Sequence, residues 1–156
     1  MIPLPTRRST TRLARAIAGA AEPGDLVVLS GELGAGKTFL VRALLRAMGL
    51  PADERVTSPT FALVNDYEIR RRKIAHADLY RLGDASELEH LGLRDRRAEG
   101  AILLVEWGEP YEAALGGDAL LVRIELGPPR TARLSASGER AARLAASVLA
   151  AAAPSA

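Results

Sequence analysis

The residues best suited to chemistry lie in one segment, Gly31-Glu32-Leu33-Gly34-Ala35-Gly36-Lys37-Thr38. It fits the pattern G-x-x-x-x-G-K-[ST], the phosphate-binding P-loop. Glycine permits backbone conformations closed to other residues, so the loop N–H groups can turn toward phosphate oxygens at a helix N-terminus. Lys37 would supply a charge for the β- and γ-phosphates, and the Thr38 hydroxyl is the expected Mg²⁺ ligand. The segment therefore predicts a nucleotide site.

A carboxylate is the second candidate group. The run Ala101-Ile102-Leu103-Leu104-Val105 is continuously apolar and ends at Glu106 and Trp107. Such a run is typical of a strand buried on both faces, and its carboxyl end can present an acid to Mg²⁺, as a Walker B strand does. The usual acid there is aspartate. Glu109 is also close, so spacing makes Glu106 a good candidate without excluding its neighbour.

Two further segments carry polar groups. Alternation along a strand would place His76, Asp78 and Tyr80 on one face, which indicates either a site or an exposed, charged strand face. Residues 56–61 hold three hydroxyls around Pro59. They are typical of a strand-entry turn or of a switch-like segment whose threonine senses the γ-phosphate, and both interpretations stay open.

The elements that must position these groups can be predicted from periodicity and turn residues. Ser9 or Thr10 can cap the first helix, and Gly49 can end the one after the P-loop. The arginine-rich turn at residues 70–73 is interpreted as a solvated connection rather than an RNA or partner contact. The predicted helices cover residues 6–21, 38–48, 84–91 and 139–153, and the predicted strands cover residues 25–30, 61–69, 73–80, 101–107, 119–126 and 130–137.

Composition limits the classes of protein. The chain has 156 residues, which suggests one domain, and its 48% hydrophobic content is ordinary for a globular protein. It has no cysteine, which excludes disulfides and thiolate zinc sites and suits the cytoplasm. A net charge of +2 is not the basic excess of a dedicated nucleic-acid binder. No apolar run approaches the roughly 20 residues of a membrane span, so no membrane partner is expected.

Four motifs, in order along the chain, resemble the TsaE (YjeE-type) family. They are the P-loop, Thr57-Ser58-Pro59-Thr60-Phe61, His76-Ala77-Asp78-Leu79-Tyr80-Arg81-Leu82, and Glu106-Trp107. The P-loop alone is unspecific, but S-P-T-[FY] and H-x-D-L-Y-R-L together are quite specific, and the resemblance covers almost the whole chain. Members of this family are small bacterial ATPases needed for threonylcarbamoyl modification of adenosine 37 of tRNA.

The resemblance implies an α/β fold, namely one P-loop NTPase-like, three-layer domain over residues 1–156 whose mixed sheet includes antiparallel hairpins. It also implies ATP and Mg²⁺ as cofactors and partner proteins of the TsaB and TsaD type. TsaD would carry out the carbamoyl transfer, and tRNA would be reached only indirectly, through the complex.

The resemblance also assigns roles by position. Lys37 and Thr38 would hold phosphates and metal, Glu106 would be a metal ligand, Asp78 would be catalytic or linked to the metal, and Thr10 would contact the nucleotide. Phe39 departs from the pattern, because many relatives have a second threonine there, so any contact of that hydroxyl is missing. The candidate catalytic residues are Lys37, Asp78 and Glu106, the metal ligands are Thr38 and Glu106, and the nucleotide-binding residues are Thr10, Gly34, Ala35, Gly36, Lys37, Thr38 and Phe39.

Hydrolysis by the isolated chain is expected to be slow. Fast phosphate hydrolysis needs an oriented water and a cation that stabilises the transition state. The chain has no glutamine to orient the water, but Asp78 could accept its proton. We expect partners to order residues 57–60 and 76–81, with Arg81 or the partner supplying the cation.

Two other classes of protein compete with this interpretation. A small-molecule kinase shares the P-loop and the size but needs an acceptor site and usually an arginine-bearing lid, for which a tight hairpin turn is poorly suited. A GTPase or non-enzymatic nucleotide switch is the other. Guanine-specific GTPases carry an N-K-x-D element, whereas the single asparagine here, Asn65, is followed by Asp66.

Overall fold

The fold is built on a mixed sheet. The computed structural model describes residues 1–59 and 63–153, and within them seven strands lie in the order β1-β7-β6-β2-β5-β4-β3. The strands β6, β2, β5 and β4 run parallel, while antiparallel pairing joins β3 to β4, β7 to β6 and β1 to β7. The bounds are β1 Ile2–Pro3, β2 Leu26–Ser30, β3 Val64–Ile69, β4 Arg72–Asp78, β5 Ile102–Glu106, β6 Ala119–Glu125 and β7 Thr131–Ala136.

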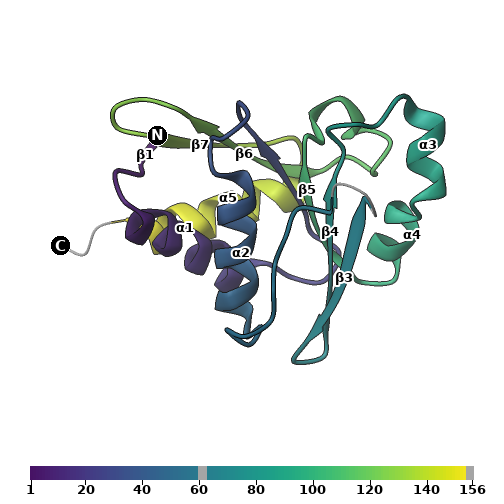
Figure 1. Ribbon diagram of the computed structural model, residues 1–156, viewed down its shortest axis with the longest axis horizontal. Helices are drawn as coiled ribbons and strands as arrows, with labels where there is room; N and C mark the ends of the chain where they lie inside the picture. The colour runs from purple at the N-terminus through teal and green to yellow at the C-terminus, as the bar shows by residue number, and fades with distance from the viewer. Residues whose placement is uncertain (60–62, 154–156) are drawn as a thin grey trace.

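Helices cover both faces of the sheet, and the two groups lie apart in Figure 1. The helices α1, α2 and α5 share one apolar cluster with the strands, while α3, α4 and the short 3-10 helix η1 border a second cluster. The predicted α/β architecture with a mixed sheet and antiparallel hairpins is therefore confirmed. The bounds are α1 Arg7–Ala20, α2 Lys37–Met48, α3 Ala85–His90, α4 Leu93–Ala98, η1 Glu109–Tyr111 and α5 Glu139–Ala152.

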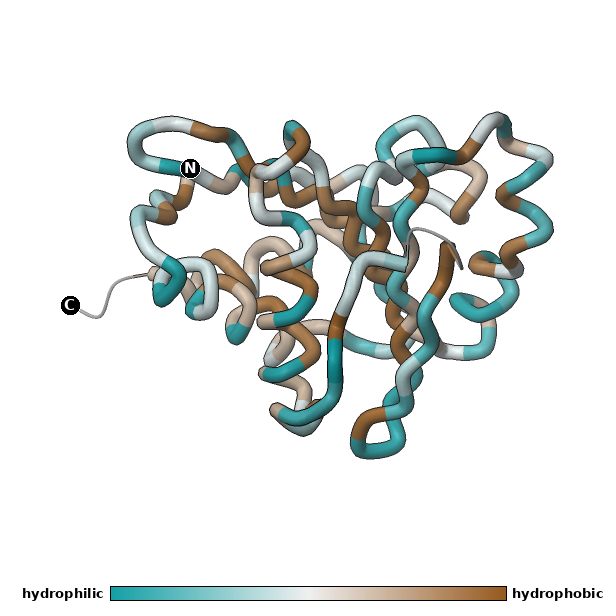
Figure 2. Tube along the Cα trace, in the orientation of Figure 1, coloured by the Kyte–Doolittle hydropathy of each residue, from teal (hydrophilic) through white to brown (hydrophobic). Residues whose placement is uncertain are grey.

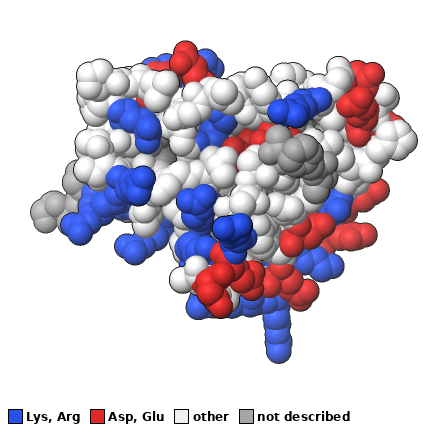
Figure 3. Space-filling view, in the orientation of Figure 1, with Lys and Arg blue, Asp and Glu red and all other residues white. Residues whose placement is uncertain are grey.

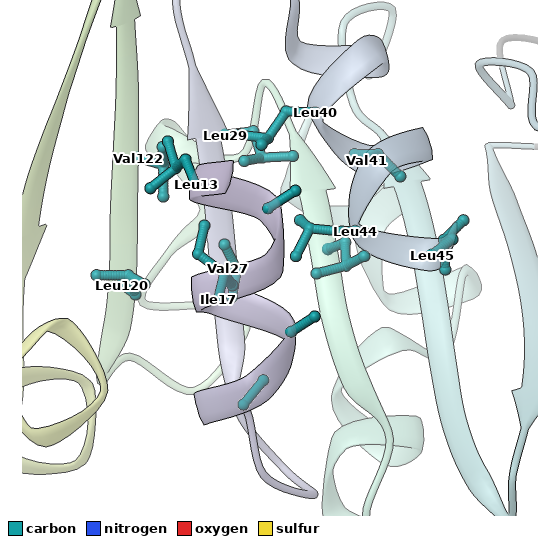
Figure 4. Packing of buried hydrophobic residues seen from close by; sticks show 14 of the residues in the cluster. Leu13, Ile17, Val27, Leu29, Leu40, Val41, Leu44, Leu45, Leu120 and Val122 are labelled. Carbon is teal, nitrogen blue, oxygen red and sulfur yellow. The ribbon is translucent and has the colours of Figure 1, made fainter. Parts of the chain in front are cut away.

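The larger cluster fixes α1 and α2 against the centre of the sheet. Leu13 and Ile17 of α1 and Leu40 and Leu44 of α2 are fully buried or nearly so, and they point toward β2 in Figure 4. Burial of this kind stabilises the fold by about 1.5–3 kcal/mol for each large aliphatic side chain. Figure 2 shows the same pattern along the whole trace, with hydrophobic residues inside and hydrophilic ones at the turn between β3 and β4.

Strand register determines where the polar groups lie. The partner of Glu106 is Leu29 on β2 and Asp78 on β4, so both acids reach the carboxyl edge of the parallel strands. The loop that follows β2 leaves from the same edge and enters α2. Ligands of open α/β sheets bind at this edge.

Several boundaries differ from the predictions. Thr6 is the N-cap of α1, with Ser9 completing a capping box, so neither Ser9 nor Thr10 is the cap. The strand β1 and the helix α4 are too short for periodicity to reveal, because β1 has two residues and α4 has six. The predicted strand at residues 61–69 is described only from residue 63 onward and begins at Val64.

The arginine-rich turn is a tight one. Arg70 and Arg71 have φ values of 51° and 67°, which suits a two-residue hairpin turn. The side chain of Arg70 covers Gly49 at the end of α2, because a Cβ there would lie 2.8 Å from Arg70 Nε. In the described part of the chain, no helix has the length and apolar character needed to cross a bilayer.

Candidate functional site

The loop between β2 and α2 has a backbone that requires glycine. Gly31, Gly34 and Gly36 have φ values of 143°, 81° and 112°. A Cβ on Gly31 would also lie 2.5 Å from the carbonyl oxygen of Ile124 on β6. Gly36 is the N-cap of α2 and offers no side-chain hydrogen bond to the first turn. The N–H groups of that turn are thus suited to an anion.

Lys37 is held across this loop. Its Nζ donates to the carbonyl oxygens of Gly31 at 2.5 Å and Glu32 at 2.9 Å. The same ammonium lies 4.2 Å from the ring centroid of Trp107. Burial lowers the pKa of Lys37, and the nearby carboxylates, first among them Glu106, oppose that shift. The cation is therefore positioned by backbone carbonyls and an aromatic ring.

Glu106 lies at the centre of a buried hydrogen-bond network. Its Oε1 accepts from Thr38 Oγ1 at 2.8 Å, and its Oε2 lies 2.5 Å from His76 Nε2. Since a carboxylate can only accept hydrogen bonds, His76 Nε2 carries a hydrogen. His76 and Glu106 are 0% and 2% exposed. Within residues 1–59 and 63–153, His76 Nδ1 is buried without a hydrogen-bond partner.

The pair Thr38 and Glu106 fits Mg²⁺. Hydroxyl and carboxylate oxygens are its ligand types, and in nucleotide sites it uses one or two protein ligands together with phosphate oxygens and water. The described chain holds no cluster of three or more histidine, cysteine, aspartate or glutamate side chains that could cage a metal alone. Glu109, the other acid considered, is exposed at the start of η1. The hydroxyl and the carboxylate are thus brought together where a bound nucleotide would complete the coordination.

Asp78 is engaged by its own surroundings. Its Oδ2 accepts from Ser58 Oγ at 2.5 Å, and its Oδ1 accepts from the backbone N–H of Tyr80 at 3.0 Å. The carboxylate is 8% exposed. The interpretation of an exposed strand face is therefore wrong for His76 and Asp78. It is also wrong that Tyr80 continues the strand face, because β4 ends at Asp78 and Tyr80 is 53% exposed.

Thr57 and Ser58, from the candidate switch segment, are described, whereas Thr60 lies outside the described residues. Ser58 links the segment to β4 through Asp78. Thr57 is exposed, and its carbonyl oxygen lies 3.4 Å from Asn65 Nδ2. The described part of the segment therefore reaches the site through Ser58.

A cavity of about 480 Å³ collects these groups, which is within the usual range for ligand sites. The ring of Tyr80 contacts that of Trp107 at its wall, with centroids 4.9 Å apart. Ala35 is a buried residue of the loop and is not among the described residues that line the cavity. Thr10 does not line it either, because it is buried in α1 with its Oγ1 3.5 Å from the carbonyl oxygen of Thr6. The described lining residues are Leu33, Gly34, Gly36, Lys37, Thr38, Phe39, Ser58, Asp78, Tyr80, Arg81, Glu106 and Trp107.

Comparisons with known proteins identify the family of this chain. The family model described as "Threonylcarbamoyl adenosine biosynthesis protein TsaE" matches residues 4–133, which include every predicted site residue. The chain belongs to the TsaE family. The resemblance drawn from its motifs is thereby confirmed.

Individual relatives of the TsaE family give the same result. The Haemophilus influenzae tRNA threonylcarbamoyladenosine biosynthesis protein TsaE is 43% identical over 67% of this chain, and the match spans 65% of that protein, slightly less than two thirds. The Mycobacterium tuberculosis protein of the same name is 40% identical over 78% of this chain and 76% of its own. The crystal structure of Bacillus subtilis YdiB superposes with a TM-score of 0.73 at 26% identity, over 92% of this chain and 88% of that one.

Two features of this TsaE-family site could not be predicted. Arg130 packs on the glycine-rich loop, because a Cβ on Gly36 would lie 3.5 Å from its Nη1. Its Nε is buried without a partner among the described residues, and its carbonyl oxygen accepts from Leu4 N at 2.6 Å. Trp107 has a φ of 59°, which is strained for a bulky residue directly after Glu106. Strain of this kind clusters at functional sites, but neither feature has a local sequence signal.

Proposed function

We propose that this chain acts in tRNA threonylcarbamoyladenosine biosynthesis as a Mg²⁺-dependent ATPase that is slow alone and accelerated by a TsaB–TsaD-type complex. The observation that carries the proposal is the 2.8 Å contact of Thr38 Oγ1 with Glu106 Oε1, two residues that line the cavity. It pairs a P-loop hydroxyl with the acid at the end of a buried strand, as metal-dependent NTPases do. The names of the relatives support the pathway.

Each residue has a role in this proposal. The amides of the loop and Lys37 bind the phosphates, and Thr38 and Glu106 would hold Mg²⁺, which supplies charge neutralisation on the β- and γ-phosphates. Lys37 already lies over the loop, so little reorganisation is needed when phosphate replaces its carbonyl partners. His76 holds Glu106 Oε2, which leaves Oε1 directed at Thr38.

Asp78 is the proposed proton acceptor. In the reaction a water oxygen bonds to the γ-phosphorus, the bond from that phosphorus to the bridging oxygen breaks, and this oxygen leaves as part of ADP. One proton of the water passes to the Asp78 carboxylate. Asp78 Oδ2 accepts a hydrogen bond from Ser58 Oγ. We therefore propose that the partner complex shifts Ser58 and releases this oxygen, with Arg81 or a partner residue supplying the cation. Since ATP and tRNA are cytoplasmic, the proposed location is the cytoplasm, and tRNA is reached only through the complex.

The test is ATP turnover by the chain alone, with TsaB and TsaD, and with both plus Asp78→Ala. We expect slow release of inorganic phosphate alone, acceleration in the complex and loss of that acceleration in the variant. Glu106→Gln should weaken nucleotide binding in Mg²⁺ but not in its absence. Full speed without partners would reject activation, and an unimpaired Asp78→Ala complex would reject the proton acceptor. A phosphorylated metabolite in place of inorganic phosphate would favour a small-molecule kinase.

A further inference from the structure

A groove between α1 and α2 is lined by arginines and has an apolar floor. Its volume is about 330 Å³. Phe39, Ala43 and Ala47 lie at four-residue spacing on α2 and form the floor, because such residues share one helix face. Arg15 of α1 and Arg42 and Arg46 of α2 form the rim. Since Phe39 also lines the candidate site, the groove and the site share a wall.

The charged side chains of the two helices that form this groove are all positive. The segments Arg7–Ala20 and Lys37–Met48 contain no aspartate or glutamate, and Figure 3 shows basic side chains gathered over α1 and α2. Among residues 1–59 and 63–153, the ion pairs within 4.0 Å are made by His76, Arg96, Arg123, Arg140 and Arg143, so none involves an arginine of α1 or α2. The arginines of α1 and α2 therefore have no carboxylate partner among the described residues, although Arg42 and Arg46 donate to backbone carbonyl oxygens.

The rim is also connected to the catalytic groups. Arg42 Nη2 donates to the carbonyl oxygen of Val56 at 3.3 Å, and Arg46 donates to the carbonyl oxygens of Pro51 and Glu54. These two arginines thus anchor the segment that leads into Thr57 and Ser58. A carboxylate that competes for Arg42 would loosen Val56, and through Ser58 it would act on Asp78.

We propose that this groove docks an acidic, amphipathic segment of the activating partner complex, an inference that rests on the proposed function. The apolar floor accepts one face of such a segment, and the rim arginines bind its carboxylates, as in other helix-in-groove interfaces. The apolar floor makes RNA a less suitable ligand for this groove, because recognition of phosphates uses polar groups and a wider basic surface. The chain's net charge of +2 also lacks the basic excess of a nucleic-acid binder.

The test uses Arg15→Glu in the full chain, because Arg15 is exposed and lies outside the candidate site. Arg12→Glu is the matched control, since Arg12 is an exposed arginine on the same helix that does not line the groove. Ala47→Glu is a second variant that places a carboxylate on the floor. Affinity for the TsaB–TsaD complex is measured by titration calorimetry, nucleotide affinity by Trp107 fluorescence, and affinity for tRNA alone by filter binding.

We expect Arg15→Glu and Ala47→Glu each to weaken binding of the complex at least tenfold, with nucleotide affinity unchanged, and Arg12→Glu to change it less than twofold. Wild-type binding by both groove variants would overturn the docking site and leave the proposed function standing. A wild-type chain that the complex neither binds nor activates would overturn both. Loss of tRNA binding in Arg15→Glu with the complex bound normally would assign the groove to RNA and overturn the inference.

Discussion

Replacing His76 by leucine tests how far one buried hydrogen bond organises the site. The bond joins His76 Nε2 to Glu106 Oε2 at 2.5 Å, and both side chains are almost completely buried. Hydrogen bonds to charged groups contribute about 1.5–3 kcal/mol to stability. Much of the loss on removing the donor arises because the buried carboxylate is left without a hydrogen-bond partner. Leucine also removes Nδ1, which is buried without a hydrogen-bond partner among the described residues, and this removal offsets part of the loss. We therefore take the lower half of the range, about 1.5–2 kcal/mol.

For a chain of 156 residues this loss corresponds to a fall in Tm of roughly 3–8 °C. The assay is thermal unfolding of the nucleotide-free chain, followed by circular dichroism. His76→Gln is the matched control, because the glutamine amide can donate to Glu106 in place of Nε2, so its Tm should fall less. A second measurement separates positioning from packing. Mg²⁺-dependent nucleotide affinity should fall about tenfold or more in His76→Leu, since groups that orient metal ligands have effects of that size.

Nucleotide affinity without Mg²⁺ should be unchanged in both variants. The reasoning would be refuted if His76→Leu unfolded at the wild-type temperature and bound Mg²⁺-nucleotide as tightly as the wild type. It would also be refuted if glutamine and leucine had equal effects on Mg²⁺-dependent binding, because the donor would then be irrelevant.

Three other outcomes are expected. Lys37→Ala should abolish ATP binding while the far-ultraviolet spectrum is kept, because Lys37 contacts the loop carbonyls rather than the core; wild-type hydrolysis would contradict the site. Arg97→Met should lower stability by about 2–3 kcal/mol with nucleotide affinity unchanged, because four carbonyl oxygens lose their donor, and an unchanged Tm would contradict this. Hydrogen bonds from Ser86 and from Glu87 N lower the pKa of Asp84 in the folded chain. The stability that Asp84 adds is therefore fully present above the pKa of the carboxyl in the unfolded chain, and it is lost as the pH falls through the lower pKa of the folded chain. The Tm of Asp84→Asn should therefore depend less on pH in the acid range than that of the wild type, and parallel curves would contradict the cap.

Much of the architecture could be predicted because its signals are local. The glycine-rich pattern and the apolar runs beside it identify a loop between a strand and a helix, and that arrangement is present at Leu26–Ser30 and Lys37–Met48. The apolar run that ends at Glu106 likewise indicates that this strand is buried, and β5 is buried along its whole length. The contact of Glu106 with Thr38 follows from the loop and the strand ending at the same edge of the sheet.

The features that escaped prediction depend on contacts between distant segments. His76 reaches Glu106 only because β4 lies next to β5, which no property of either strand's sequence specifies. Arg130 reaches Gly36 because a hairpin folds over the loop. Thr6 is the N-cap in place of the predicted Ser9 or Thr10, because its reciprocal hydrogen bonds with Ser9 form a capping box one turn earlier.

The first residues of the chain bear on the site although none of them lines it. β1 pairs with β7, and Leu4 N donates to the carbonyl oxygen of Arg130, whose guanidinium rests on Gly36. The pairing of β1 with β7 and the hydrogen bond from Leu4 therefore help to hold Arg130 against the glycine-rich loop. A change at that end is therefore expected to reach the glycine-rich loop through Arg130, and the end of α5 adjoins the same region, because Ala152 lines one pocket with Ile2 and Pro3.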